Sequence, residues 1–136
     1  MPNDPLWTFH GYVTAAGGQE VQDWFDELQD EAKDEVRDTL AYLEHLPQHL
    51  WRKPEYFPLG DGLSELRFKS NVLNKTIRIY GFFWPKGKRH HYTLLLGTEK
   101  KVMNPKGDIR NARKRKAEVE QGKRTIHEFE FTEDPH

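Results

Sequence analysis

The sequence contains no cysteine, which excludes disulfide bonds, thiolate zinc sites and a cysteine nucleophile. It also lacks any apolar run near the roughly 20 residues that a membrane-spanning helix needs. Met1–Gly11 contains no basic segment followed by an apolar one, as a signal peptide would. We therefore expect a soluble, unexported, cytoplasmic protein with no membrane partner.

The net charge is also small, with a formal value of only -1. The two signs are nevertheless sorted: residues 1–66 carry 4 basic and 14 acidic side chains, whereas residues 67–124 carry 17 basic and 4 acidic ones. Such sorting is typical of a protein that offers a basic surface to a polyanion, here most simply RNA. Alternatively, acidic helices neutralise a basic sheet inside the fold, and both interpretations stay open.

The chain length predicts one domain over residues 1–136, with a core over about 7–123 and an acidic tail over 124–136. Alternation of bulky and small or polar residues predicts a first strand at 7–13. Apolar residues at helical spacing then predict one helix from Val21 to Leu28 and a second from Asp30 to Pro47.

Residues 49–61, with two prolines and a glycine, indicate a connection. Beyond it the period changes to two, which predicts an antiparallel meander of three strands ending at Thr98. Asn104 and Pro105 are typical of a helix start, and Gly122 of a helix end.

These elements predict an α+β fold of two layers in the order β-α-α-β-β-β-α, with an antiparallel sheet and the helices packed on one face. His127–Phe131 alternates again and is compatible with an extra C-terminal edge strand or with an acidic arm. As a hypothesis, the tail shields the basic face.

The open face of such a sheet would carry Arg67, Lys69, Arg78, Tyr80 and one of the histidines at 90 and 91. This set has no carboxylate pair but suits phosphate recognition by arginine. RNA can be cleaved without a metal when its own 2′-OH attacks the adjacent phosphate, provided that protons are transferred and the extra charge is stabilised. The alternative is an ordinary solvated sheet face. The candidate catalytic residues are Arg67, Arg78, Tyr80 and His91.

The histidines do not indicate a metal site, and we expect no cofactor. His90 and His91 are consecutive in a strand and point to opposite faces. His45 and His49 have helical spacing, but Pro47 between them breaks the helix that such a pair would require.

Several motifs occur in a particular order: Gly62-Leu63-Ser64-Glu65-Leu66-Arg67, then Arg78-Ile79-Tyr80, then Lys100-Lys101 followed by Pro105, Ile109, Ala112 and Arg115. In this order the chain, over roughly Trp7–Lys123, resembles the HigB-like branch of the RelE/ParE toxin superfamily, whose members include phage-derived proteins. The resemblance implies a RelE-like fold and the toxin of a type II toxin–antitoxin system. It also implies a metal-independent, ribosome-dependent mRNA endoribonuclease, or mRNA interferase.

The implied partners are mRNA, the ribosome and a cognate helix-turn-helix antitoxin, with the toxin monomeric alone or in a larger assembly with its antitoxin. Two alternatives remain: a non-catalytic ParE-like inhibitor of DNA gyrase, and a degenerate phage-derived binding module. The arginines with the lysine pair favour the endoribonuclease. The predicted RNA-binding residues are Lys69, Lys86, Lys88, Arg89, His90, Lys100, Lys101 and Arg113, although the basic helix that contains Arg113 is also compatible with a solvated face.

Overall fold

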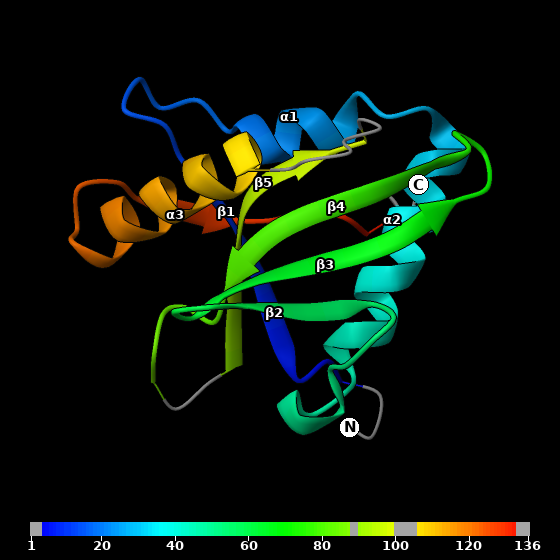
Figure 1. Ribbon diagram of the computed structural model, residues 1–136, viewed down its shortest axis with the longest axis horizontal. Coiled ribbons are helices and arrows are strands. Elements are labelled where there is room, and N and C mark those ends of the chain that lie inside the picture. The colour runs from blue at the N-terminus through cyan, green and yellow to red at the C-terminus, as the bar shows by residue number, and fades with distance from the viewer. Residues whose placement is uncertain (1–3, 88–89, 100–105, 133–136) are drawn as a thin grey trace.

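The computed structural model describes residues 4–87, 90–99 and 106–132, and in this part the chain forms a six-stranded sheet and three α-helices (Figure 1). The α+β class predicted from the sequence is confirmed. In this part no helix is both long and apolar enough to cross a membrane. In chain order the elements are β1 (Trp7–Tyr12), α1 (Glu20–Asp26), α2 (Asp30–Glu44), the 3-10 helix η1 (Gln48–Leu50), β2 (Tyr56–Gly60), β3 (Leu63–Ser70), β4 (Lys75–Phe82), β5 (His90–Thr98), α3 (Lys106–Glu120) and β6 (Ile126–Glu128).

The strands lie in the order β2-β3-β4-β5-β1-β6. Neighbours from β2 to β5 are antiparallel, but β1 runs parallel to β5, with Trp7 opposite His90. The prediction of an entirely antiparallel sheet is therefore wrong at this pair. Between β1 and β5 the chain contains α1, α2 and the strands β2 to β4, far more than the roughly dozen residues that a parallel connection needs.

Strand β2 lies where the sequence predicted only a connection. Its Pro58 cannot donate a backbone hydrogen bond, which is tolerated because β2 forms one edge of the sheet. The strand was not predicted because its proline and glycine are residues typical of a connection.

Helices cover both faces of the sheet, so the predicted two-layer arrangement with helices on one face is wrong. Helices α1 and α2 pack on one face, where Val21, Phe25, Val36 and Leu40 join the inward residues of the strands. Helix α3 packs on the other face through Ala112 and Val119, against Leu63, Tyr80, Phe82 and Leu95. On that second face the core under α3 is apolar, and Arg67 and Arg78 lie further along β3 and β4.

A β-bulge in β5 allows this strand to supply both cores. Tyr80 pairs with Leu96 and Gly81 pairs with Leu94, which leaves Leu95 as the extra residue. Leu94 enters the core under α1 and α2, whereas Leu95 enters the core under α3. Arg115 of α3 donates a hydrogen bond to the Leu95 carbonyl at 2.8 Å.

The segment after α3 is part of the packed structure, so the core extends past the predicted limit at residue 123. Strand β6 pairs with β1, and the side chains of Phe129 and Phe131 are buried in the core under α1 and α2. Gln22 of α1 accepts a hydrogen bond from the Glu130 backbone N–H and donates one to its carbonyl, each at 2.8 Å. Strand β6 thus lies at the opposite edge of the sheet from β3, and Phe129 and Phe131 lie on the face opposite Arg67 and Arg78, so the hypothesis that the tail shields the basic face is wrong for these two arginines and for the tail up to residue 132.

Candidate nucleic-acid interface

Arg67 of β3 and Arg78 of β4 lie directly opposite each other on the face of the sheet that carries α3. Two like charges in this position repel. The Oε2 atom of Glu65 accepts hydrogen bonds from Nε and Nη2 of Arg67 at 3.0 and 2.6 Å, and its Oε1 atom lies 3.3 Å from Nε of Arg78. We call Glu65, Arg67 and Arg78 the arginine cluster.

The carboxylate of this cluster is buried, while the guanidinium groups reach the surface. The Glu65 side chain is 2% exposed, against 16% for Arg78 and 38% for Arg67. Within the described ranges, no further hydrogen bond or ion pair engages Nη1 of Arg67 or either Nη atom of Arg78. The Arg67 guanidinium is fixed by two hydrogen bonds, whereas Nε of Arg78 has the ion pair with Glu65 but no hydrogen-bond partner in the described part of the chain. Two neighbouring guanidinium groups with unused N–H donors suit a phosphate.

Phe57 of β2 supports the cluster, because the Arg67 guanidinium carbon lies 3.9 Å from the centre of its ring. This stacking fixes the plane of the guanidinium group. The Arg67 side chain is therefore held from two directions, by the Glu65 carboxylate at its edge and by the Phe57 ring on its face.

Tyr80 lies opposite Glu65 in the pairing of β3 with β4, and its side chain is fully buried under α3. Its hydroxyl has no hydrogen-bond partner in the described part of the chain. Burial and the nearby Glu65 and Asp108 carboxylates raise the pKa of Tyr80 to about 12, although Arg78 opposes the shift. Tyr80 is therefore a neutral hydroxyl at physiological pH and can donate a proton but not accept one as a general base.

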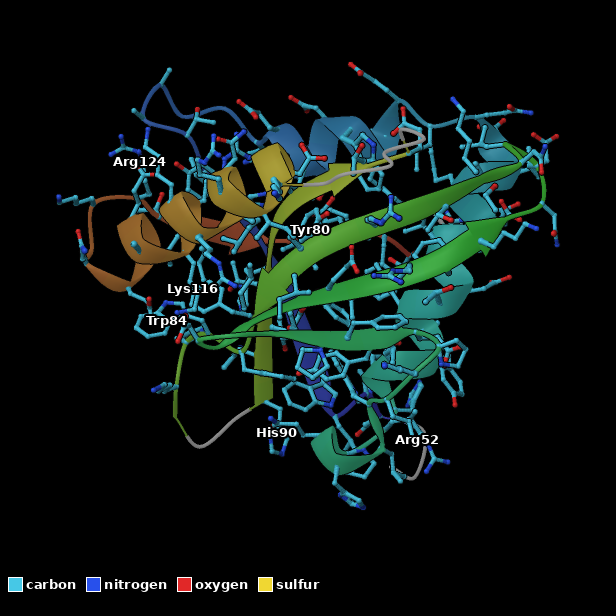
Figure 2. All side chains as sticks on the ribbon, viewed as in Figure 1. Arg52, Tyr80, Trp84, His90, Lys116 and Arg124 are labelled. Atoms are coloured by element: carbon cyan, nitrogen blue, oxygen red, sulfur yellow. The ribbon has the colours of Figure 1, made fainter. Side chains whose placement is uncertain are left out.

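The other predicted catalytic residue, His91, lies on the same face but near the opposite end of β5. Thr98, which pairs with Arg78, is seven residues beyond His91. At ~3.3 Å per residue the two positions are roughly 20 Å apart, so one phosphate cannot contact both Arg78 and His91. In Figure 2 Tyr80 and His90, the neighbour of His91, lie in different parts of the sheet.

His91 instead forms a pair with His10 of β1, in which Nδ1 of His91 lies 2.9 Å from Nε2 of His10. Burial of His10, together with its electrostatic interaction with His91, lowers the pKa of His10. His90 is exposed, with its ring 4.8 Å from that of Trp7, and Lys86 is exposed nearby. The structure thus divides the predicted residues between the arginine cluster and this second group.

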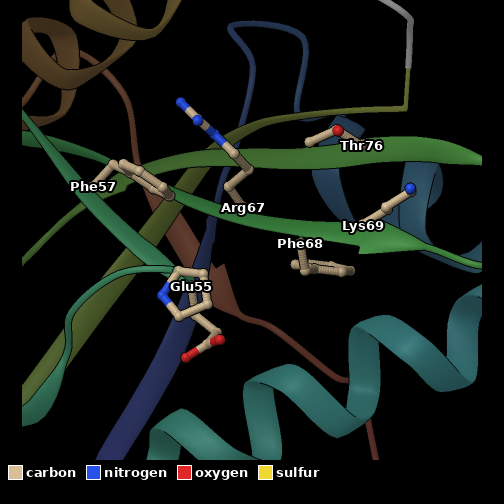
Figure 3. Close-up of a pocket in the computed structure, with 7 residues that line it drawn as sticks. Glu55, Phe57, Arg67, Phe68, Lys69 and Thr76 are labelled. Atoms are coloured by element: carbon tan, nitrogen blue, oxygen red, sulfur yellow. The ribbon is translucent and has the colours of Figure 1, made fainter.

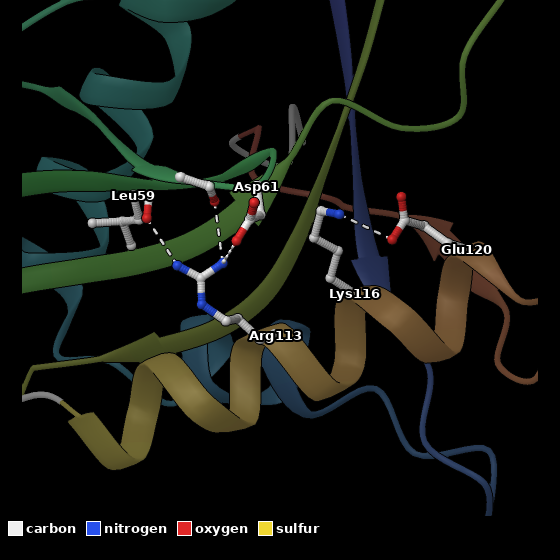
Figure 4. A network of polar contacts seen from close by, with 6 residues as sticks. Leu59, Asp61, Arg113, Lys116 and Glu120 are labelled. Atoms are coloured by element: carbon white, nitrogen blue, oxygen red, sulfur yellow. Dashed lines mark hydrogen bonds and ion pairs between the residues drawn. The ribbon is translucent and has the colours of Figure 1, made fainter.

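The predicted RNA-binding residue Arg113 is engaged within the fold, as Figure 4 shows. Its Nη atoms donate hydrogen bonds to the carbonyls of Leu59 and Gly60 at 2.8 and 3.1 Å, and Asp61 lies 3.9 Å away. Arg113 therefore ties α3 to the turn between β2 and β3. Lys88, Arg89, Lys100 and Lys101 lie outside the described residues, so their predicted contacts with RNA remain predictions.

A notch of about 360 Å³ adjoins the arginine cluster at the edge of the sheet (Figure 3). Arg67 and Lys69 project from β3 on the same side, with Phe57 beside Arg67. Glu55, Phe68 and Thr76 also line the notch. Sequence analysis predicted Arg67 and Lys69 but missed Phe57 and the structural role of Glu65. The alternation of Glu65, Arg67 and Lys69 along one strand face was the available signal for Glu65.

Among the described residues, no group of three or more histidine, aspartate or glutamate side chains is arranged to hold a metal ion. Residues 23–117, which contain the arginine cluster and the notch, match the family model described as Phage derived protein Gp49-like (DUF891). No curated protein and no solved structure matches the chain significantly. Since the family match spans more than half of the chain, the protein belongs to the phage-derived Gp49-like family, a family of RelE/HigB-like toxins.

Proposed function

We propose that this protein is the toxin of a type II toxin–antitoxin pair and that it cleaves mRNA on the ribosome without a metal. The observation that carries the proposal is the arginine cluster, with two guanidinium groups held by one buried carboxylate on an accessible face. Membership of a toxin family supports it. The partners in this proposal are mRNA, the ribosome and a helix-turn-helix antitoxin, and the site of action is the cytoplasm.

The proposed reaction uses the 2′-OH of the RNA as the nucleophile. A bond forms between the 2′-oxygen and phosphorus while the bond from phosphorus to the 5′-oxygen breaks; a base removes the 2′ proton, and the leaving oxygen gains one. Arg67 and Arg78 would stabilise the added negative charge on the phosphate oxygens. Tyr80 lies two residues from Arg78 on the same face and is protonated at neutral pH, but its hydroxyl is buried under α3, so it would donate a proton to the leaving oxygen only where RNA binding uncovers it.

The test maps new 5′ ends in cellular transcripts after brief induction of the protein in a bacterial host. Wild type is compared with Arg78→Ala at matched protein levels. The control is Lys123→Ala, which removes one positive charge from an exposed position after α3. We expect cuts inside translated reading frames with wild type and with the control, and a loss of at least tenfold with Arg78→Ala, because one of two charge-stabilising donors is absent.

Two other results of this experiment would favour a different function. Growth arrest without new 5′ ends would contradict the endoribonuclease proposal and favour a binding inhibitor of the gyrase-directed type. Neither arrest nor cutting would indicate a fold that serves only to bind a partner.

A further inference from the structure

The notch beside the arginine cluster has the size and lining of a small-ligand site. Its volume of about 360 Å³ lies at the lower end of the range of ~300–1,000 Å³ that is common for such sites. The walls combine the aromatic rings of Phe57 and Phe68 with the charged side chains of Glu55, Arg67 and Lys69 (Figure 3). A ligand with a flat apolar body and polar edges fits this composition.

The edge of β3 adds unused backbone groups to the notch. The Arg67 N–H points toward the β2 side, where it donates to the Glu55 carbonyl at 2.9 Å. Because backbone groups alternate along a strand, the N–H and C=O of Lys69 point to the same side, beyond the first residue of β2. No hydrogen bond to either group occurs within the described ranges. One donor and one acceptor, side by side, are therefore available at the notch.

We propose that the notch binds one nucleobase of the RNA whose backbone lies on the arginine cluster, an inference that rests on the proposed function. The base would stack on the Arg67 guanidinium, which is itself supported by the Phe57 ring, and its polar edge would pair with the peptide group of Lys69. Arg67 belongs to both the cluster and the notch, so a phosphate and a base of one strand can bind together.

A peptide strand is the other ligand that could pair with an exposed sheet edge. The free edge at Lys69 is short, because β3 ends one residue later at Ser70. Strand addition draws its affinity from several successive backbone hydrogen bonds, whereas a base needs only one donor and one acceptor. The stacked aromatic and cationic groups also favour a base.

The test measures binding of two short, uncleavable 2′-O-methyl RNA oligonucleotides, one complete and one with an abasic central position. We expect wild type to bind the complete oligonucleotide about tenfold more tightly, as is typical for one stacked base. Phe57→Leu should reduce this ratio toward one. Tyr42→Leu, a control at an exposed aromatic residue of α2, should leave it unchanged. Arg78→Ala should weaken both oligonucleotides similarly and preserve the ratio.

A second pair of variants examines the backbone contact and is independent of whether Phe57→Leu folds. Lys69→Ala removes an exposed side chain beyond Cβ but keeps the backbone N–H, whereas Lys69→Pro also removes the N–H at an edge position that tolerates proline. Proline should lower the ratio below that of alanine. Equal affinity of wild type for the two oligonucleotides would overturn the inference and leave the phosphate site intact. Binding of neither would overturn the RNA site itself.

Discussion

Arg67 and Arg78 face each other across two strands, and a single buried carboxylate holds both of them. Breaking a buried ion pair leaves an uncompensated charge, so Glu65 is required for the site to exist in this form. In return, the two guanidinium groups are oriented before any ligand arrives. Less side-chain entropy is then lost when a phosphate binds, which raises affinity without adding a contact.

At Tyr80, the effect of one hydroxyl group on stability and its effect on activity can be measured separately. Its buried hydroxyl lacks a hydrogen-bond partner in the described part of the chain, and such a group costs about 1–3 kcal/mol. Tyr80→Phe should therefore keep or raise the free energy of unfolding, by about 1 kcal/mol, in chemical denaturation. If Tyr80 donates a proton in the reaction, transcript cleavage should fall at least tenfold in the same variant. Unchanged cleavage would remove Tyr80 from the catalytic residues.

At the scale of elements, the segment after α3 contributes to stability. Phe129 is buried between Phe25 and Phe131, with ring centroids 5.4 and 6.4 Å away. Phe129→Ala should lower the free energy of unfolding by about 3–4 kcal/mol, as is usual when a buried phenylalanine is truncated. The exposed Tyr42→Ala should change it by less than about 0.5 kcal/mol. Equal melting temperatures for wild type and Phe129→Ala would show that this segment is not docked in solution.

Periodicity predicted the helices and most strands, because side-chain spacing depends on local geometry alone. It could not predict which face of the sheet α3 covers, since an apolar stripe matches either face. Arg67 and Arg78 were found because they alternate on adjacent strands, whereas β2 was hidden by its proline. His91 was grouped with them because it shares their face, but the length of β5 separates it from the cluster.

Across the described part of the molecule, some of the basic residues that the sequence places after residue 66 are paired within the fold. In α3, Arg113 binds carbonyls of the β2–β3 turn, Arg115 pairs with Glu20 at 2.7 Å and Lys116 pairs with Glu120 at 2.9 Å. Some of the basic residues are thus neutralised by acidic ones inside the fold, as one interpretation of the sequence had it, whereas others remain available to a polyanion, as the other had it. Among the described residues, the basic charge available to a polyanion is therefore smaller than the sequence suggests.

This distribution predicts a modest dependence of RNA affinity on salt. For single strands the slope of log affinity against log salt is about -0.7 for each phosphate neutralised. Arg78→Ala should reduce the magnitude of the slope by about 0.7 in binding titrations from 50 to 200 mM salt. Lys123→Ala should leave the slope unchanged. The same titration with Arg113→Ala tests whether this residue also contacts RNA. An unchanged slope would show that Arg113 makes contacts only within the fold.

Leu95 is one residue more than the pairing of β4 with β5 requires. Tyr80 and Gly81 are consecutive in β4, so loss of Leu95 would make their partners Leu96 and Leu94 consecutive as well, and His91 would stay on the face of Arg78 while the core under α3 lost one leucine. It would also remove the carbonyl that Arg115 binds. Among related chains, a one-residue gap at Leu95 would therefore leave both faces of the sheet as they are and remove only what the bulge itself contributes, an effect that no single substitution reproduces.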